Sequence, residues 1–467
     1  MSKYTKLGKN IGLITLGSFA SKLLNVLFVP FYTAILSTAE YGIADIFSTT
    51  ITLLFPVFTL MICEAMMRYA LEDKRLAEKI YASGMFIWFA GFICLVILAP
   101  FLGRLKAFQG NISIFVMYYF SYSLYFNVSY FARGIEKVGI YAIAGIVQTA
   151  VAITLNILFL AVYAWGMKGY LFAYIIADFV AALFIIFGAK LYKYRFSAID
   201  KQLLKKMLLL SLPMIPTQIS WWITNSSNKY MLLYLSGAAI AGIFSISYKI
   251  PSIMNVLIGI FSSAWRISSV DGYGTEENKF FFNDIYRKYF SLSIIAGSLI
   301  MLLNKLLASF LYSKEFFIAY KYVPVLVLAV MLNGFSDFTG SAYIAEKKTN
   351  MLFYSTGIGA VINIILNYLL IPRFEAYGAA FATLLSYLAI WVIRVHFCKD
   401  FIKLTLDLKR NYLSLGLLTI EMILIIFDKT LFYFISAIIC VAILLINRNI
   451  IRHFYVMFLN LIERWRK

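Results

Sequence analysis

The sequence predicts an all-α integral membrane protein with about 14 transmembrane helices, on the basis of three observations. Hydrophobic residues make up 62% of the 467 residues and charged residues only 14%, a composition that soluble proteins of this length do not show. The apolar residues form runs long enough to cross a bilayer. The basic residues, which give a net charge of +20, concentrate in the short loops between these runs.

The first two apolar runs, residues 11–36 and 43–67, are separated by a polar turn that begins at Ser37. Because this turn is so short, we expect the two runs to form an antiparallel pair of spanning helices. The tripeptide Tyr41-Gly42-Ile43 at the start of the second helix has echoes around Gly169, Gly242 and Gly378. These echoes favour a transporter built from duplicated halves, although glycine is also common at helix starts in general.

The same reasoning predicts a span at each later apolar run. The complete set covers residues 11–36, 43–67, 80–102, 112–132, 139–163, 169–190, 207–235, 241–266, 288–311, 323–344, 351–371, 377–397, 411–427 and 430–447. Prolines inside several spans, Pro251 among them, permit bends. The loops are too short to fold as domains, so we expect the activity of this chain to lie within the membrane.

The distribution of lysine and arginine predicts the orientation and the domains. Both termini are expected to be cytoplasmic, because the basic residues then fall mostly in cytoplasmic loops and tails. The basic segment that follows the sixth span is interpreted as a linker between two pseudo-symmetric lobes. The predicted domains are a six-helix lobe at 1–190, a cytoplasmic linker at 191–206, a second six-helix lobe at 207–398, and two extra helices with a cytoplasmic tail at 399–467.

The sequence gives no indication of an enzyme or of a cofactor site. The four cysteines, Cys63, Cys94, Cys398 and Cys440, lie far apart and form no CxxC pair. We find no nucleophile–base set, no metal-ligand pattern and no glycine-rich phosphate loop. The basic residues fit membrane topology, so no nucleic-acid partner is expected. We therefore predict no catalytic residue, no metal and no cofactor.

Basic residues inside or at the ends of the spans are the candidate substrate-binding residues, because such residues are costly in a membrane and usually face a cavity or a partner. Together they would form a cationic cavity suited to an anionic substrate. Alternatively, the lysines extend to the membrane surface or pair with acids. The arginines, among them also Arg133 and Arg394, would then anchor helix ends at the membrane interface. The candidates are Lys22, Lys229, Lys249, Arg68 and Arg266.

Acidic residues within the spans are candidate coupling or structural acids. They are Asp45, Glu64, Asp178 and Asp337, and Glu421 is a further acid in a late span. Glu64 lies four residues before Arg68, so a simple ion pair on one helix face is the plain interpretation of these two residues.

Several segments near the N-terminus resemble the opening of bacterial polysaccharide repeat-unit flippases. These segments are Ser21-Lys22-Leu23-Leu24, Val29-Pro30-Phe31-Tyr32 and Ser37-Thr38-Ala39-Glu40-Tyr41-Gly42. Such flippases belong to the multidrug/oligosaccharidyl-lipid/polysaccharide exporter superfamily. The resemblance implies two six-helix lobes facing each other in a V, a cationic central cavity that includes Lys22, and alternating access.

The resemblance also implies a substrate, partners and a location. The substrate would be an oligosaccharide repeat unit of O-antigen or capsule linked through diphosphate to undecaprenol. The partners would be membrane lipids and the polysaccharide polymerase machinery, at the bacterial cytoplasmic (inner) membrane. An ion-coupled multidrug or cation antiporter of the same superfamily is the first alternative, and the buried acids would serve it. A membrane polymerase or glycosyltransferase is the second, but it would need a sizeable loop with catalytic residues outside the membrane, which this sequence lacks.

Overall fold

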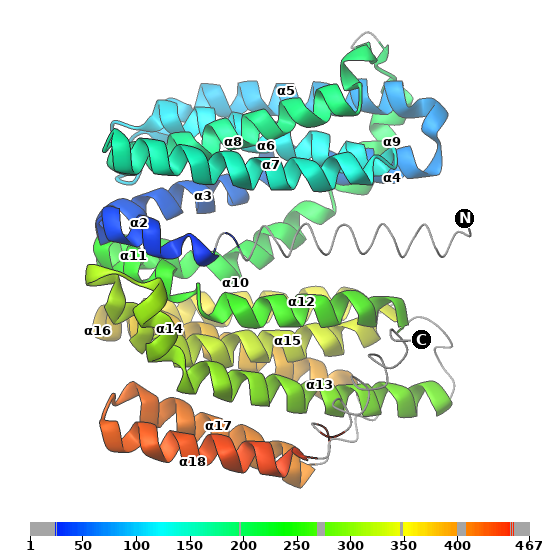
Figure 1. Ribbon diagram of the computed structural model, residues 1–467. Helices are drawn as coiled ribbons and strands as arrows, with labels where there is room; N and C mark the ends of the chain where they lie inside the picture. Colours follow the sequence, from blue (N-terminus) through cyan, green and yellow to red (C-terminus); the bar gives the residue numbers. More distant parts are fainter. Residues whose placement is uncertain are drawn as a thin grey trace, which may run out of the picture. The chain divides into compact units, whose positions relative to one another are not determined.

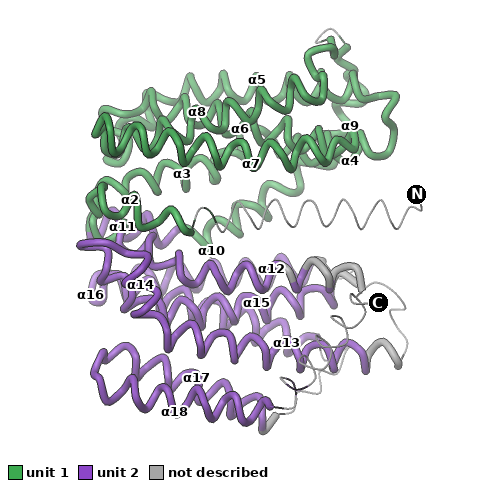
Figure 2. Tube along the Cα trace, in the orientation of Figure 1, with its two compact units in different colours: residues 1–226, 237–242 green, residues 227–236, 243–467 purple. Residues whose placement is uncertain are grey.

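The computed structural model describes residues 24, 26–195, 198–268, 276–345, 349–398, 408–448, 450 and 452. The described residues form helices joined by short turns and contain no strand, which confirms the predicted all-α class (Figure 1). Contacts between residues divide the chain into two compact units (Figure 2). Unit 1 comprises Met1–Ser226 and Gly237–Gly242, and unit 2 comprises Ser227–Ser236 and Ile243–Lys467.

The helices of unit 1 pack alongside one another around an apolar core. This core includes Ile80, Phe131 and Met207, which come from three different helices. The helices are α2 (Val29–Ile35), α3 (Thr38–Phe58), α4 (Ile62–Glu72), α5 (Ala77–Leu102), α6 (Ile112–Gly134), α7 (Val138–Asn156) with a π-helical end at Ile157–Val162, α8 (Gly166–Gly188), α9 (Lys201–Ser211), most of α10 (Met214–Leu235) and the start of α11 (Ala238–Ser247).

The polar turn before α3 forms a capping box. The hydroxyl of Ser37 accepts a hydrogen bond from the backbone N–H of Glu40 at 3.3 Å, and the Glu40 carboxylate accepts one from the N–H of Ser37 at 3.0 Å. The second carboxylate oxygen of Glu40 accepts the backbone N–H of Met167, at 3.3 Å, in the first turn of α8. One side chain thus satisfies the starts of two helices.

The second predicted span, residues 43–67, is broken into two helices. Leu60 and Met61 have φ angles of 52° and 51° between the end of α3 and the start of α4. Gly91 of α5 lies against the end of α3, where a Cβ atom would stand 1.7 Å from the carbonyl oxygen of Phe58. The lack of a side chain at Gly91 therefore allows α5 and the end of α3 to meet backbone to backbone.

Two of the echoed glycines contact one another within unit 1. A Cβ atom on Gly42 would lie 2.2 Å from the carbonyl oxygen of Ala238, and one on Gly242 would lie 1.9 Å from that of Thr38. The first turns of α3 and α11 therefore cross at backbone contact distance. Here the glycine motif has a packing role that residues with a Cβ atom would not allow.

Unit 2 contains the remaining helices, two of which are kinked or bent relative to the prediction. They are α12 (Pro251–Ser268), α13 (Glu276–Leu302), α14 (Asn304–Leu311), the 3₁₀ segment η5 (Lys314–Lys321), α15 (Val323–Ala345), α16 (Thr349–Cys398), α17 (Leu408–Ile426) and α18 (Thr430–Ile446). The predicted span 241–266 is bent by 45° between α11 and α12, where Pro251 begins the second helix. Helix α16 contains the predicted spans 351–371 and 377–397, with a kink at Glu375 between them.

Seven described helices are long and apolar enough to cross a membrane, or eight if the bent pair α11 and α12 is one span. The chain is therefore a multi-pass membrane protein, while the figure of about 14 spans stays a prediction. Within the expected linker 191–206, α9 begins at Lys201 and packs on α4 and α5. The division into two six-helix lobes also stays a prediction.

Candidate functional site

The structure describes only some of the candidate basic residues. Lys22 lies outside the described residues, and Arg266 lies in α12 with a side chain that is not described. Lys229 of α10 and Lys249, in the break between α11 and α12, are both half buried in unit 2. Their neighbours Asn228 and Tyr248 are joined by a side-chain hydrogen bond of 3.4 Å, so the two lysines come from adjacent segments. Their role in a cationic cavity stays a prediction.

Arg68 lies on the surface of unit 1 and forms an ion pair with Glu72. Its Nε atom is 3.1 Å from the Glu72 carboxylate, and its side chain is 66% exposed. The expected pair with Glu64 is wrong, because Arg68 extends toward the C-terminal end of α4 rather than back toward Glu64. An exposed pair of this kind contributes little to stability.

Asp178 is a buried acid inside unit 1. It belongs to α8, is 3% exposed, and accepts a hydrogen bond of 3.0 Å from the side-chain amide of Gln148 in α7. Tyrosine hydroxyls from α6 and α8 interact with it electrostatically, those of Tyr118, Tyr122 and Tyr174 among them. Asp178 thus sits where three helices meet, among neutral polar partners.

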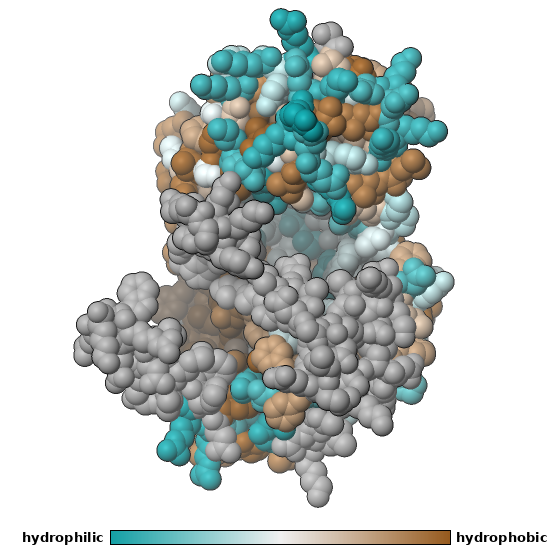
Figure 3. Space-filling model, turned by 90° about the vertical axis from the view of Figure 1, so that its right-hand side faces the viewer, coloured by the Kyte–Doolittle hydropathy of each residue, from teal (hydrophilic) through white to brown (hydrophobic). Residues whose placement is uncertain are grey.

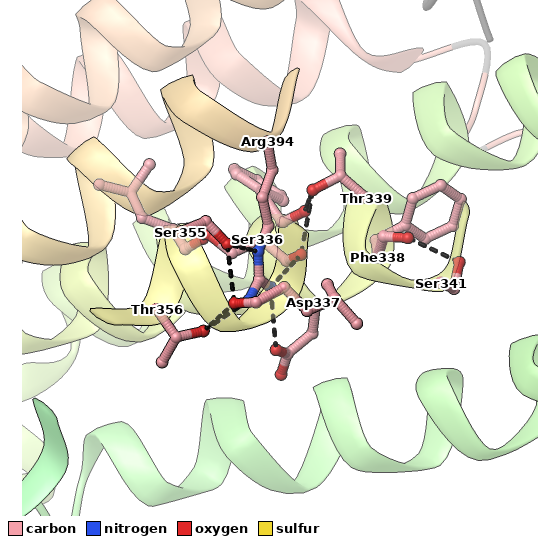
Figure 4. A network of polar contacts seen from close by, with 11 residues as sticks. Ser336, Asp337, Phe338, Thr339, Ser341, Ser355, Thr356 and Arg394 are labelled. Carbon is pink, nitrogen blue, oxygen red and sulfur yellow. Dashed lines mark hydrogen bonds and ion pairs between the residues drawn. The ribbon is translucent and has the colours of Figure 1, made fainter. Parts of the chain in front are cut away.

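Arg394 is the corresponding buried base in unit 2 (Figure 4). Its guanidinium donates to the hydroxyl of Ser355 at 3.0 Å, to the backbone carbonyl of Ser336 at 2.8 Å and to the hydroxyl of Thr356 at 2.9 Å. The carboxylate of Asp337 lies 3.9 Å away. Gly340 faces the same guanidinium, and a Cβ atom there would stand 3.2 Å from Nη1.

The interpretation of Arg394 as an interfacial anchor is wrong, because its side chain is only 5% exposed and joins α15 to α16. Asp337, one of the candidate acids, is its counter-ion and is about one-third exposed at its side chain. Asp45 lies half buried on α3, and Glu64 lies half buried on α4. The coupling role of these acids stays a prediction.

The sequence reasoning gave no role to a cluster of neutral polar side chains in unit 2. The amide of Asn228 donates to Thr383 at 3.1 Å, and Ser227 donates to Asn363 at 3.1 Å. Asn367 donates to Asn363 at 2.8 Å, one turn along the same helix. The i, i+4 spacing of these two asparagines within an apolar run is the sequence pattern that could have indicated this polar cluster.

Basic residues gather at one end of unit 1. Figure 3 shows hydrophilic side chains crowded over this end of the unit. The starts of α5 and α9 and the ends of α4, α6 and α8 meet there, whereas the opposite end carries Arg104, Lys106 and Lys168. The basic residues of the crowded end are Arg68, Lys74, Arg75, Lys79, Arg133, Lys137, Lys190, Lys193, Arg195, Lys201, Lys205 and Lys206.

The first part of the sequence decides the family. The family model described as polysaccharide biosynthesis protein matches residues 7–265, which is more than half of the chain. The chain belongs to this polysaccharide biosynthesis family. No curated protein matches the sequence.

Solved transporter structures share the fold of this family member. An inward-facing multidrug resistance MATE transporter of the MOP superfamily matches with a TM-score of 0.68 and 14% identity, over 82% of this chain and 96% of that one. The lipid II flippase MurJ in an inward closed conformation matches with a TM-score of 0.67 and 16% identity, over 95% and 99%. A MOP superfamily transporter from Pyrococcus furiosus matches with a TM-score of 0.58 and 16% identity, over 85% and 96%.

These matches confirm the expected resemblance at the level of family and fold. The similar structures are transporters and a flippase, in agreement with the expectation that this chain is not an enzyme. Within the described part of the chain, no group of three His, Cys, Asp or Glu side chains could hold a metal ion.

Proposed function

We propose that this polysaccharide biosynthesis protein is a flippase for undecaprenyl-diphosphate-linked oligosaccharide repeat units, such as those of O-antigen or capsule. The observation that carries the proposal is the family match over residues 7–265 in a chain that has the fold of a lipid II flippase. Movement from the inner to the outer leaflet of the bacterial inner membrane would proceed by alternating access. Membrane lipids and the polysaccharide polymerase would be its partners.

The charge distribution of unit 1 supports an orientation. Loops rich in lysine and arginine stay on the cytoplasmic side of a membrane protein. The end of unit 1 that carries Lys137, Lys190 and Lys201 would therefore face the cytoplasm, and both termini would lie on that side. A negative cytoplasm also favours outward movement of an anionic headgroup, by about 2.3 kcal/mol per charge at 100 mV.

The proposed cationic cavity would neutralise the diphosphate of the substrate. Lys22, Lys229 and Lys249 are its first candidates, with Arg68 and Arg266 at its edge. A buried ammonium at moderate dielectric attracts a nearby anion by a few kcal/mol, which is enough to bind the headgroup during its passage. Arg68 is the weakest candidate, because it lies on the surface beside Glu72.

Deletion of the gene tests the proposal. We expect surface polysaccharide to disappear, while the lipid-linked precursor is still made and stays on the cytoplasmic face. Complementation with Lys22→Ala should fail at a normal level of membrane protein, whereas Lys22→Arg should restore much of the export because it keeps the charge. Surface polysaccharide, precursor and protein level are measured in each strain. A deletion strain that makes no precursor would point to a biosynthetic enzyme instead.

An ion-coupled antiporter for drugs or cations is the second candidate. The MATE-type fold and the buried acid Asp178 favour it. The same deletion and overexpression strains separate the two functions, because an antiporter would change drug resistance and leave surface polysaccharide intact. A normal polysaccharide level together with altered resistance would replace the flippase proposal by this one.

A further inference from the structure

The C-terminal hairpin of unit 2, formed by α17 and α18, packs on α13 and also contacts α15. At its turn, Asp428 accepts a hydrogen bond of 2.9 Å from Lys305 of α14 and another from the hydroxyl of Tyr320 in η5. The burial of the carboxylate opposes ionisation, but these two hydrogen bonds prevail and lower the pKa of Asp428. This end of the hairpin is therefore held by a satisfied ion pair.

Deeper in the hairpin, Glu421 of α17 is fully buried. The hydroxyl of Ser298 on α13 lies 2.6 Å from its Oε2 atom, and its Oε1 atom is buried without a hydrogen-bond partner in the described structure. Cys440 of α18 interacts with both Ser298 and Glu421. Three helices thus each contribute one polar side chain to a small network inside an apolar bundle.

No cation balances Glu421 in the described part of the structure. On α13, Lys288 pairs with Asp284, and Arg287 lies about three helical turns before Ser298; on α17, Arg410 lies about three turns before Glu421. On α15, Asp337 is the counter-ion of Arg394. The titratable group that faces Glu421 is the thiol of Cys440, and α13 contributes the uncharged Ser298. An ionised carboxylate with a single hydrogen bond in such surroundings would carry a large desolvation cost.

We propose that Glu421 is a proton-binding site, and that the bound proton is what allows the α17–α18 hairpin to dock on α13. With its proton, the carboxyl group is neutral and tolerates one oxygen without a partner. When the proton leaves, the charge has no partner in the bundle, and separation of the hairpin from α13 admits water to it. Docking of the hairpin is therefore linked to one proton, independently of which substrate the protein carries.

Two measurements on the purified full-length protein test this site. The infrared difference spectrum, obtained by subtracting the spectrum of Glu421→Gln from that of the wild type at neutral pH, should contain the carbonyl band of a protonated carboxylic acid. Maleimide labelling of Cys440, with Cys63, Cys94 and Cys398 replaced by alanine, then reports docking. Above the pH at which half of the Glu421 side chains have lost their proton, the ratio of the labelling rates of wild type and Glu421→Gln should rise by up to about tenfold per pH unit. The reason is that loss of one proton controls the separation of the hairpin from α13.

Glu421→Gln is the matched control, since it imitates the neutral acid and changes the ionisation of Cys440 least. A constant labelling ratio across the pH range would overturn the proposal, as would a difference spectrum with carboxylate bands alone at neutral pH. Failure of Glu421→Gln to accumulate, with Glu421→Asp accumulating normally, would also contradict it. Asp428→Asn loosens the other end of the hairpin and should raise labelling equally at all pH values above about 6.

Discussion

Asp178 in unit 1 and Arg394 in unit 2 are both buried where helices pack, but they carry opposite charges and have very different partners. Asp178 accepts a single hydrogen bond from Gln148. Arg394 donates hydrogen bonds to Ser336, Ser355 and Thr356 and has Asp337 as a counter-ion. The acid is thus poorly compensated, whereas the base is almost fully compensated.

This difference follows from the chemistry of the two groups. A carboxylate can escape the cost of burial by binding a proton, whereas a guanidinium stays charged at all accessible pH values. The protein must therefore satisfy Arg394 through structure, which makes it a fixed link between α15 and α16. Asp178 retains the freedom to change its charge, and this supports its candidacy as a coupling acid.

Loss of the Arg394 side chain should have the largest effect on stability. Arg394→Met leaves Asp337 without its counter-ion and two hydroxyls without their donor, so we expect a loss of about 3–5 kcal/mol in the free energy of unfolding. Arg394→Lys should recover only part of this loss, because an ammonium does not reproduce the geometry of the three hydrogen bonds. Thermal unfolding of the purified protein measures both variants.

Asp178→Asn is the partner variant in unit 1 and should cost about 1 kcal/mol or less, because the amide keeps the shape and can still bond Gln148. Arg68→Ala serves as a surface control, with an expected change below about 1 kcal/mol. Equal losses for Arg394→Met and Asp178→Asn would break the contrast between a fixed base and a switchable acid.

The crossing of α3 and α11 is a buried contact that depends on close backbone packing and involves no charged group. Gly42→Ala places a methyl group against the backbone of α11, with Ala238 as the nearest obstacle, so α3 and α11 must move apart. We expect a loss of about 1–3 kcal/mol, typical of overpacking. Gly139→Ala in α7 is the matched control, because no atom lies within 4 Å of the added Cβ and the alanine favours the helix. A neutral Gly42→Ala would show that this crossing is not tightly packed.

The sequence predicted the helical membrane class and the positions of most helices, because length and hydropathy alone decide them. It also placed Gly42 and Gly242 at helix starts, although it did not predict that the two would touch. Contacts such as that of Arg394 with Ser355 and Thr356 join residues from separate turns of different helices. No pattern within one helix encodes them, so Arg394 was misread as an interfacial residue.

Prolines within the predicted spans lie near two of the breaks. Pro251 begins the helix after the bend between α11 and α12, and Pro56 lies one turn before the break at Leu60 and Met61. The positive φ angles of Leu60 and Met61 themselves were not predicted, because neither residue is glycine. The partner of Arg68 was missed for a related reason. Glu64 and Glu72 both lie four residues away on α4, and only the observed side-chain conformation selects Glu72.

The smallest expected effect concerns an acid of the same type as Asp178 on the surface of the same unit. Asp200 caps α9 by accepting the backbone N–H groups of Leu203 and Gln202, at 3.1 and 3.0 Å, and pairs with Lys79 at 3.2 Å. The hydrogen bond from Leu203 and the contact with Lys79 lower the pKa of Asp200. A lowered pKa means that the stabilisation is complete above the unfolded-state value of about 3.9 and is lost as the pH falls through the lower folded-state value.

Acidification below about pH 4 should therefore speed hydrogen exchange of the first amides of α9 in the wild type. Asp200→Asn keeps a good capping side chain but cannot titrate, so its exchange, corrected for the intrinsic rate at each pH, should not change over this range. The effect should stay local to α9, since solvent screens an exposed pair, and other helices of unit 1 provide the internal reference. If acid opens α9 equally in both proteins, the capping charge of Asp200 does not control docking of this helix, and another group must titrate.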